Sequence, residues 1–334
     1  MQRVWTRRAI TVPLVALVCL LAWALAPLWL AMALLVDLAR ARRVRRAMAT
    51  RLLGFALVYL AAEVLGLAVL VLVWLLALGG RDRVERLVTW TYAVQRRWAH
   101  ALFVAARALL SLRFEIEGDE LLAPGPLLVL VNHASLLDTL LPTVFITHAR
   151  GIRLRFVLKR ELLVSPCLDV AGLRLPNVFV DRSATQTAVE LGKIRRLAEG
   201  LGPSEGVLIY PEGTRATPAK KARALAALGT AEPRLRALAD SFAHVMPPRI
   251  GGTVALLDGA PDADVVLFAH RGLEGFARFA DFLDGSLVGR TVRMRLWRVP
   301  RAEIPSDRDE RARWLFAQWA ALDRFVGSAA ASNG

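Results

Sequence analysis

The sequence predicts an α/β domain with a mostly parallel sheet flanked by helices, preceded by an N-terminal pair of membrane-embedded helices. Two observations carry this prediction. From residue 113 onward, short apolar runs rich in β-branched residues alternate with stretches of helical periodicity, which is the order of a parallel sheet covered by helices. Before residue 80, two long apolar runs lie close together in a chain that is 55% apolar overall.

Both N-terminal runs are long enough to cross a bilayer. Residues 10–36 carry no charge and residues 52–78 carry only Glu63, whereas about 20 apolar residues span the hydrocarbon core. Arginines lie in the intervening loop and on both outer flanks, so two simple crossings would conflict with the positive-inside rule. We therefore favour kinked, re-entrant segments with the arginines at the cytoplasmic headgroup surface. We expect Glu63 to be protonated or paired with a neighbouring helix.

Composition divides the chain into four predicted parts. These are a membrane-embedded helical hairpin (residues 1–80), an interfacial linker helix (81–112), the α/β domain (113–327) and a disordered tail (328–334). The net charge of +15 suits anionic lipids or phosphorylated ligands. Nucleic acid is not an expected partner, because zinc-finger, RNP and helix-turn-helix patterns are missing. The two cysteines, Cys19 and Cys167, form no metal motif, and no metal site is expected.

Each strand of the α/β domain is predicted from an apolar run that stops at a polar or turn-forming residue. The predicted strands are residues 113–117, 129–131, 154–158, 175–180, 207–210, 265–268 and 292–299, and the predicted helices include 138–148, 184–201 and 306–326. Ligands bind at the carboxyl ends of the strands in such sheets. His133, Lys159, Arg182 and residues 212–215 all fall at that end, which favours one shared site.

The strand that ends at Val131 leads directly into the polar pair His133 and Asp138. On one straight helix these two side chains would diverge by roughly 140°. They can meet only if His133 lies on the turn and Asp138 lies in the first helical turn. An imidazole that a carboxylate orients in this way is a general base near neutral pH.

Two sequence blocks carry a family resemblance. The first is Asn132-His133-x-Ser135-x-x-Asp138, and the second is Pro211-Glu212-Gly213-Thr214-Arg215, about 75 residues downstream. In this order, each at the end of a strand, they resemble the glycerolipid acyltransferase family, whose members transfer an acyl chain from a thioester to a lysophospholipid or glycerophosphate hydroxyl. The resemblance covers roughly residues 95–300.

The resemblance implies an acyltransferase that converts 1-acyl-sn-glycerol-3-phosphate to phosphatidic acid. Acyl-CoA or acyl carrier protein would be the co-substrate, without a cofactor, and membrane lipids would surround the protein. It implies a bacterial-type inner membrane, with the catalytic domain facing the cytoplasm. His133 would be the base and Asp138 its orienting acid, and backbone N–H groups after His133 are candidates for holding the oxyanion.

Candidate acceptor-binding residues lie in the second block and at two further strand ends. Arg182 and Arg215 match positions credited with phosphate binding, and Lys159 is a third candidate cation. Glu212 would bond the glycerol backbone or hold Arg215, Gly213 would let the backbone approach the ligand, and Thr214 completes the block.

Several alternatives stay open at this stage. The segment Pro247-Pro248-Arg249 departs from the commonest family form and looks more like the subgroup that acts on lysophosphatidylinositol or lysocardiolipin, so the acceptor is open. A non-catalytic lipid-binding protein on the same fold and a lipid hydrolase are the rivals from other classes. We expect no enzyme nucleophile, because Ser135 suits a turn cap or a bond to Asp138, and Cys167 suits a buried small residue.

Overall fold

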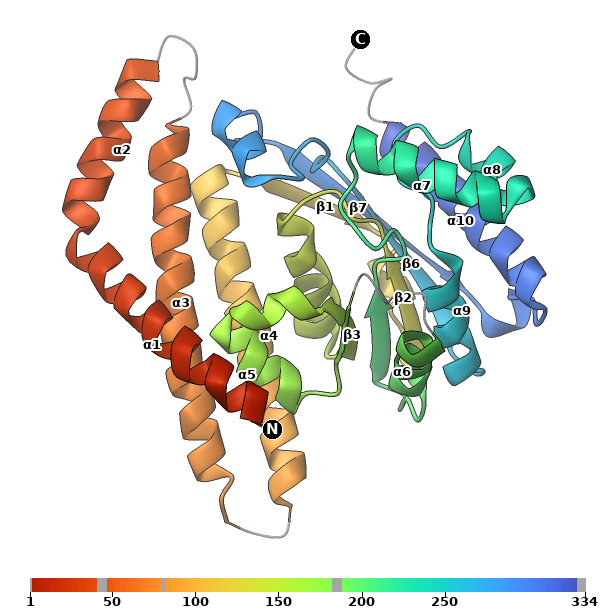
Figure 1. Cartoon of the computed structure of the whole chain (residues 1–334), viewed down its shortest axis with the longest axis horizontal. Helices are drawn as coiled ribbons and strands as arrows, with labels where there is room; N and C mark the ends of the chain where they lie inside the picture. Colours follow the sequence, from red (N-terminus) through yellow and green to blue (C-terminus); the bar gives the residue numbers. More distant parts are fainter. Residues whose placement is uncertain (1, 41–46, 80–81, 182–187, 329–334) are drawn as a thin grey trace. The chain divides into compact units, whose positions relative to one another are not determined.

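The computed structural model describes residues 2–40, 47–79, 82–181 and 188–328 (Figure 1). The chain divides into two compact units. The first comprises Met1–Arg113, Leu158–Asn177 and Phe279–Arg290, and the second comprises Phe114–Val157, Val178–Arg278 and Thr291–Gly334. Two segments from within the predicted α/β domain therefore group with the N-terminal helices. Most of the predicted tail, residues 329–334, lies outside the described residues.

The first unit is built mainly from helices. These are α1 (Gln2–Ala24), α2 (Ala26–Arg40), α3 (Met48–Leu76), α4 (Arg83–Leu110) and the short α5 (Pro166–Arg174). The predicted kink occurs between α1 and α2, where Pro27 has no N–H to continue the helical hydrogen bonds. Pro13, in contrast, lies within an unbroken α1.

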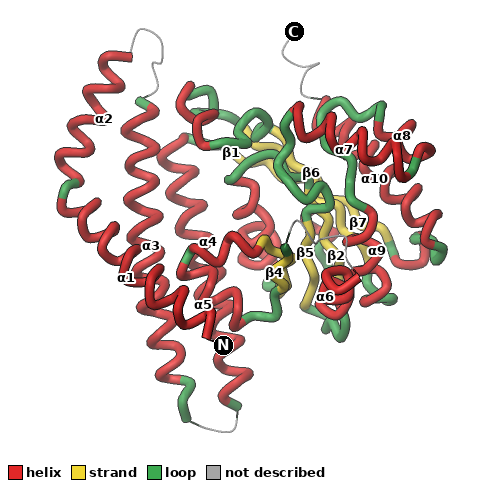
Figure 2. The backbone as a smooth tube through the Cα atoms, in the orientation of Figure 1, coloured by secondary structure: helices red, strands yellow, loops and turns green. Residues whose placement is uncertain are grey.

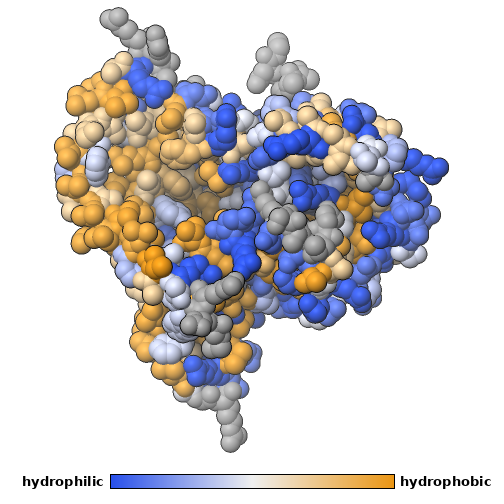
Figure 3. All heavy atoms as spheres, in the orientation of Figure 1, coloured by the Kyte–Doolittle hydropathy of each residue, from blue (hydrophilic) through white to orange (hydrophobic). Residues whose placement is uncertain are grey.

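Two helices of this unit are long and apolar enough to cross a membrane, judged by length and composition alone: Val4–Ala24 and Met48–Leu76. Their outward side chains are apolar, as Figure 3 shows over α1, α2 and α3. Leu20, Leu35 and Leu65, one on each of these helices, are 66%, 65% and 65% exposed. An exposed apolar surface of this kind is typical of a membrane-contacting face.

Glu63 is the acidic residue inside α3, and it is paired as predicted. It is 1% exposed, and Ser165 Oγ donates to its carboxylate at 3.0 Å while the N–H of Cys167 donates at 3.2 Å. Glu63 thus caps the N-terminus of α5, where negative charge is favoured. Cys167 is buried against α3 as expected, and its Sγ donates to the Glu63 carbonyl oxygen at 3.1 Å.

The second unit is organised on a seven-stranded sheet (Figure 2), apart from the residues where β1 begins and β3 ends. Its strands are β1 (Arg113–Glu117), β2 (Leu127–Val131), β3 (Arg153–Lys159), β4 (Val178–Val180), β5 (Glu205–Ile209), β6 (Asp264–Arg271) and β7 (Thr291–Val299). The order is β1-β7-β6-β2-β5-β3-β4. β2 is parallel to β5 and β6, β3 is parallel to β5, and β7 is antiparallel to β6. The mostly parallel sheet is confirmed.

The central strand β2 is buried on both faces. Leu128 and Leu130 point to a core that also contains residues of α6 (Ala188–Ala198), α9 (Ile250–Gly259) and α10 (Arg308–Gly327), including the fully buried Trp319. The alternate residues, Leu127, Val129 and Val131, point to the other face and are 0% exposed. This double burial explains why β2 is a continuous apolar run.

Two elements differ in detail from the sequence prediction, and a third begins where it was predicted. The predicted helix over 138–148 is a 3₁₀ turn, Leu137–Leu140, followed by a π-helical stretch, Thr143–His148. The predicted strand over 175–180 is only Val178–Val180, because Pro176 cannot donate to a neighbouring strand. The closing helix begins as predicted, since the Asp307 side chain accepts from the N–H groups of Asp309 and Glu310.

Helices α6 and α9 approach closely at one glycine, which gives a test of the packing. A Cβ on Gly259 would overlap the carbonyl oxygen of Arg195, whereas a Cβ on Gly192 meets nothing within 4 Å. Gly259→Ala should therefore lower the free energy of unfolding by about 1–3 kcal/mol, because the helices must separate. As the matched control, Gly192→Ala should raise it by about 0.5–1 kcal/mol. Thermal unfolding followed by circular dichroism measures both, and equal effects would contradict this packing.

Candidate active site

The site begins where the parallel ladder of β2 and β6 ends. The last paired residues are Val131 and Phe268. Beyond them, the Asn132 side chain takes over: Oδ1 accepts from the His270 N–H at 2.9 Å, and Nδ2 donates to the His270 carbonyl at 3.0 Å. The amide side chain thereby satisfies the backbone of β6, and the main chain after Asn132 is free to leave the sheet.

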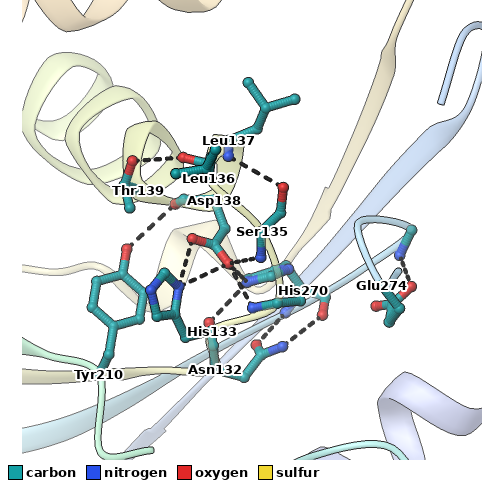
Figure 4. A network of polar contacts seen from close by, with 12 residues as sticks. Asn132, His133, Ser135, Leu136, Leu137, Asp138, Thr139, Tyr210, His270 and Glu274 are labelled. Carbon is teal, nitrogen blue, oxygen red and sulfur yellow. Dashed lines mark hydrogen bonds and ion pairs between the residues drawn. The ribbon is translucent and has the colours of Figure 1, made fainter. Parts of the chain in front are cut away.

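His133 and Asp138 meet as predicted, with His133 on the turn and Asp138 in the 3₁₀ turn (Figure 4). His133 Nδ1 lies 2.9 Å from Asp138 Oδ1 and 3.2 Å from Oδ2. The backbone N–H groups of Ala134 and Ser135 donate to Oδ2 at 2.7 Å and 2.8 Å. Asp138 is therefore fixed by the turn that presents His133.

The carboxyl of Asp138 is ionised in this setting. It is 0% exposed, and burial alone would raise its pKa. The neighbouring His133 and His270 outweigh burial and hold the pKa of Asp138 well below its ordinary value. A carboxylate only accepts hydrogen bonds, so Nδ1 of His133 carries the hydrogen and Nε2 is left as the proton acceptor.

The first two N–H groups after His133 were predicted as candidates for holding the oxyanion, and for these two residues the prediction is wrong. The N–H groups of Ala134 and Ser135 are both engaged by Asp138 Oδ2, and they point inward to the acid rather than outward to a substrate. The hydroxyl of Ser135 accepts from the N–H of Leu137 at 3.3 Å. Ser135 is thus the turn cap that the sequence suggested, and it is 0% exposed.

Two residues of this network escaped the sequence analysis. His270, at the end of β6, places Nε2 3.4 Å from Asp138 Oδ2. Tyr210 follows β5, and its ring lies 4.6 Å from the His133 ring, while its hydroxyl donates to the Asp138 carbonyl at 3.4 Å. His270 is the last residue but one of β6 and Tyr210 comes directly after β5, so both lie at the carboxyl ends of strands that neighbour β2. This position at a strand end was the available signal.

The Glu212–Arg215 block forms a tight turn at the end of β5. The N–H of Gly213 donates to the Tyr210 carbonyl at 2.9 Å, and Gly213 adopts a positive φ of 67°, which favours glycine. The N–H of Ala216 then donates to the His133 carbonyl at 3.0 Å. The second motif block is thereby tied directly to the first.

Glu212 lies inside this turn rather than at its surface. It is 2% exposed, and neither carboxyl oxygen has a hydrogen-bond partner within the described residues. Burial raises the pKa of Glu212 well above its ordinary value. The N–H of His133 and the indole of Trp319 are near enough to lower this pKa, but their effect is smaller than that of burial. No ion pair joins it to Arg215 among the described residues, so the predicted alternative that Glu212 holds Arg215 is wrong.

Two guanidinium groups lie beside this turn without an acidic partner among the residues that the structure describes. Arg215 is half-buried, and its Nη1 is buried without a hydrogen-bond partner. The N–H of Arg249 donates to the Pro211 carbonyl at 2.9 Å, and its side chain runs across Gly213, where a Cβ would lie 3.0 Å from Nε. A buried, unpaired guanidinium is costly, and an anion would satisfy it.

Three other residues were predicted to bind the acceptor: Lys159, Arg182 and Thr214. Lys159 is the last residue of β3, is partly buried and belongs to the first unit. Arg182 lies outside the described residues. Thr214 is mostly buried, and its hydroxyl accepts from Lys220 Nζ at 3.0 Å. Across the described ranges, no three His, Cys, Asp or Glu side chains are grouped as ligands for a metal ion.

Comparisons with known proteins support the sequence resemblance. Residues 113–248 match the family model described as Acyltransferase. A 1-acyl-sn-glycerol-3-phosphate acyltransferase of Pseudomonas aeruginosa is 32% identical over 126 residues, which are 36% of this chain and 45% of that protein. The match thus spans less than half of that relative's length.

The fold is shared with a solved structure. The crystal structure of the 1-acyl-sn-glycerophosphate (LPA) acyltransferase PlsC from Thermotoga maritima is similar, with a TM-score of 0.55 and 16% sequence identity. The similarity covers 85% of this chain and 96% of that chain. At this level of identity, the likeness shows a common fold.

The lowered pKa of Asp138 predicts how acid affects stability. Its folded pKa lies below the ordinary value of 3.8, so the carboxylate stabilises the fold above that pH, and the contribution is lost as the pH falls further. Asp138→Asn should lower the free energy of unfolding by about 1–3 kcal/mol at neutral pH. The gap between variant and wild type should shrink between about pH 4 and pH 2. Denaturant unfolding across this range measures it, and a constant gap would refute the assignment.

Proposed function

We propose that the protein is a membrane-bound acyltransferase that esterifies the free hydroxyl of 1-acyl-sn-glycerol-3-phosphate and produces phosphatidic acid. The acyl donor is a thioester of coenzyme A or of acyl carrier protein. One observation carries the proposal: within the residues that match the Acyltransferase family model, a buried carboxylate fixes the hydrogen of His133 on Nδ1 and leaves Nε2 as a base.

The proposed reaction proceeds by direct attack. His133 Nε2 removes the proton of the acceptor hydroxyl while the oxygen bonds to the thioester carbonyl carbon. Asp138 stabilises the imidazolium that forms. The tetrahedral intermediate then collapses, the carbon–sulfur bond breaks, and His133 returns the proton to the departing thiolate. Base catalysis of this kind contributes about 10²–10⁴-fold to the rate.

The acceptor's phosphate is proposed to bind Arg215, whose buried Nη1 has no partner among the described residues. Guanidinium groups pair with phosphate oxygens through two parallel hydrogen bonds. Arg249 supplies a second cation beside the same turn. Arg182 and Lys159 remain proposed contributors. Glu212 is 2% exposed, so we assign it to supporting the His133 turn and not to contacting the acceptor.

The rival functions make different demands on the chain. A serine hydrolase needs its nucleophile on a turn that follows a strand. The one Gly-x-Ser-x-Gly pattern in the sequence, residues 202–206, instead runs into the start of β5, at the opposite sheet edge from His133. A non-catalytic lipid-binding protein would not need a buried acid to orient His133.

A larger lysophospholipid, with a lysophosphatidylinositol-like or lysocardiolipin-like headgroup, remains the alternative acceptor because of Arg249.

The proposed location is a bacterial-type inner membrane, with the α/β unit on the cytoplasmic side. The apolar outer surfaces of α1, α2 and α3 support membrane contact. The acyl chains of the lysophospholipid and of its product would remain in the bilayer, and the thioester donor would arrive from the cytoplasm.

The central experiment incubates membranes containing the protein with radiolabelled acyl-CoA or acyl carrier protein and a panel of lysophospholipids. The wild type should yield labelled phosphatidic acid from lysophosphatidic acid. His133→Ala should lower turnover by about 10³-fold or more, because the acceptor alcohol loses its base. Thin-layer chromatography separates the two-chain product from free fatty acid. Labelled fatty acid alone would indicate a hydrolase, and unchanged turnover by the variant would disprove the mechanism.

Arg215 gives a separate test of phosphate binding. Arg215→Gln should raise the KM for lysophosphatidic acid by about 10- to 100-fold, because a charge-assisted hydrogen bond is lost. The KM for the thioester should change little. Arg223→Gln is the matched control, since Arg223 is exposed on α7 (Pro218–Ala231). Equal effects on acceptor and donor, or equal effects of both variants, would exclude Arg215 as the phosphate ligand.

A further inference from the structure

We infer that His270 is a positioning residue for acyl transfer, which holds Asp138 through a second imidazole in addition to that of His133. This inference rests on the proposed function, since it assigns a role in the same reaction. The two imidazoles and the shared acid are drawn in Figure 4.

The hydrogen-bond pattern fixes which nitrogen of His270 carries a hydrogen. Nε2 lies 2.9 Å from the Asn132 carbonyl oxygen and 3.4 Å from Asp138 Oδ2. Both neighbours only accept hydrogen bonds, so Nε2 must be an N–H that both oxygens share. Nδ1 is buried and has no hydrogen-bond partner within the described residues.

His270 occupies a position that its strand would otherwise fill with an apolar side chain. Leu267 and Ala269 belong to the core that contains α9 and α10, so Phe268 and His270 point to the opposite face of β6. His270 is 0% exposed. A buried imidazole is costly unless it is paired, and here its pairing is with the acid that orients His133.

The position of His270 is itself held by Asn132. Asn132 bonds both the N–H and the carbonyl of His270, at 2.9 Å and 3.0 Å. The same residue offers its own carbonyl to the imidazole. His270 therefore cannot move relative to the turn that carries His133 without breaking three hydrogen bonds.

The donors around Asp138 divide between its two oxygens. Oδ2 receives the N–H groups of Ala134 and Ser135 and faces Nε2 of His270, whereas Oδ1 receives Nδ1 of His133 at the shorter of its two distances. His270 thus helps to hold Oδ2 and leaves Oδ1 directed at the catalytic imidazole. Without this contact, rotation of the carboxylate would weaken the bond that sets the tautomer of His133.

The surroundings of His270 favour its protonated form. Burial lowers its pKa, but Asp138, by hydrogen bond and by charge, and Glu274 outweigh burial, and the pKa of His270 is raised overall. Across the β-ladder its neighbour is Met294, which has no charge, and Arg271 turns away to Phe325 and Ser328. The attraction to Asp138 that raises this pKa is the same contact that holds Oδ2.

Two substitutions separate position from charge. His270→Phe removes the donor and keeps a ring, and it should lower kcat about 10- to 100-fold with both KM values unchanged. His270→Gln keeps an N–H donor near Nε2 without a charge, and it should restore kcat to within a few-fold of the wild type.

The measurement uses the full chain in detergent, with the folded fraction of each variant determined by circular dichroism. Wild-type kcat and pH profile in a folded His270→Phe would overturn the proposal. Equal losses in both variants, in proportion to the folded fraction, would show a purely structural role and would also overturn it.

An independent readout separates this inference from the proposed function. The five histidines are followed by NMR on selectively labelled protein, and His133 is assigned from the signal missing in His133→Gln. The Nδ1–H tautomer of His133 should lose population in His270→Phe and regain it in His270→Gln, whether or not the acyl acceptor has been identified. If the wild type transfers no acyl group, the proposed function fails. An unchanged tautomer of His133 in His270→Phe refutes the inference about His270.

Discussion

The buried carboxylate of Asp138 is the interaction on which the site depends. Removing a carboxylate from water is costly unless donors replace the solvent. Here the donors are two backbone N–H groups of the turn and two imidazoles. The same bonds that satisfy the charge also shape the turn after β2 and aim His133. Stability of the turn and orientation of the base are therefore one property of the chain.

The architecture was largely predictable because β2 is an unbroken apolar run that ends in polar residues. That pattern indicates a strand buried on both faces of a parallel sheet, and the sheet has this form. The meeting of His133 with Asp138 also followed from their spacing. The irregular segment after Asp138 did not, because it is a 3₁₀ turn followed by a short π-helical stretch, and an apolar pattern over so few residues does not separate these from an α-helix.

The missed parts of the site depend on contacts between distant segments. His270 and Asn132 are 138 residues apart, and only the register of β2 against β6 brings them together. Tyr210 was predicted only as the last residue of a strand, and its side chain was given no role in the site. The burial of Glu212 was also hidden, since Trp319 beside it comes from the closing helix. Sequence spacing identifies contacts between residues that are close along the chain. Contacts between distant residues, such as Asn132 and His270, follow only from the register of the sheet.

The cap that Glu63 forms on α5 bears on the order in which the protein is assembled. Its partner Ser165 is 102 residues further along the chain. At ordinary rates of translation, about 5–20 residues per second, that interval is about 5–20 s. The nascent α3 must therefore exist for seconds with an acid whose final donors have not yet been synthesised. Completion of this helix's polar contacts is a late event in biogenesis, and it waits for a segment that lies beyond the first strands of the sheet.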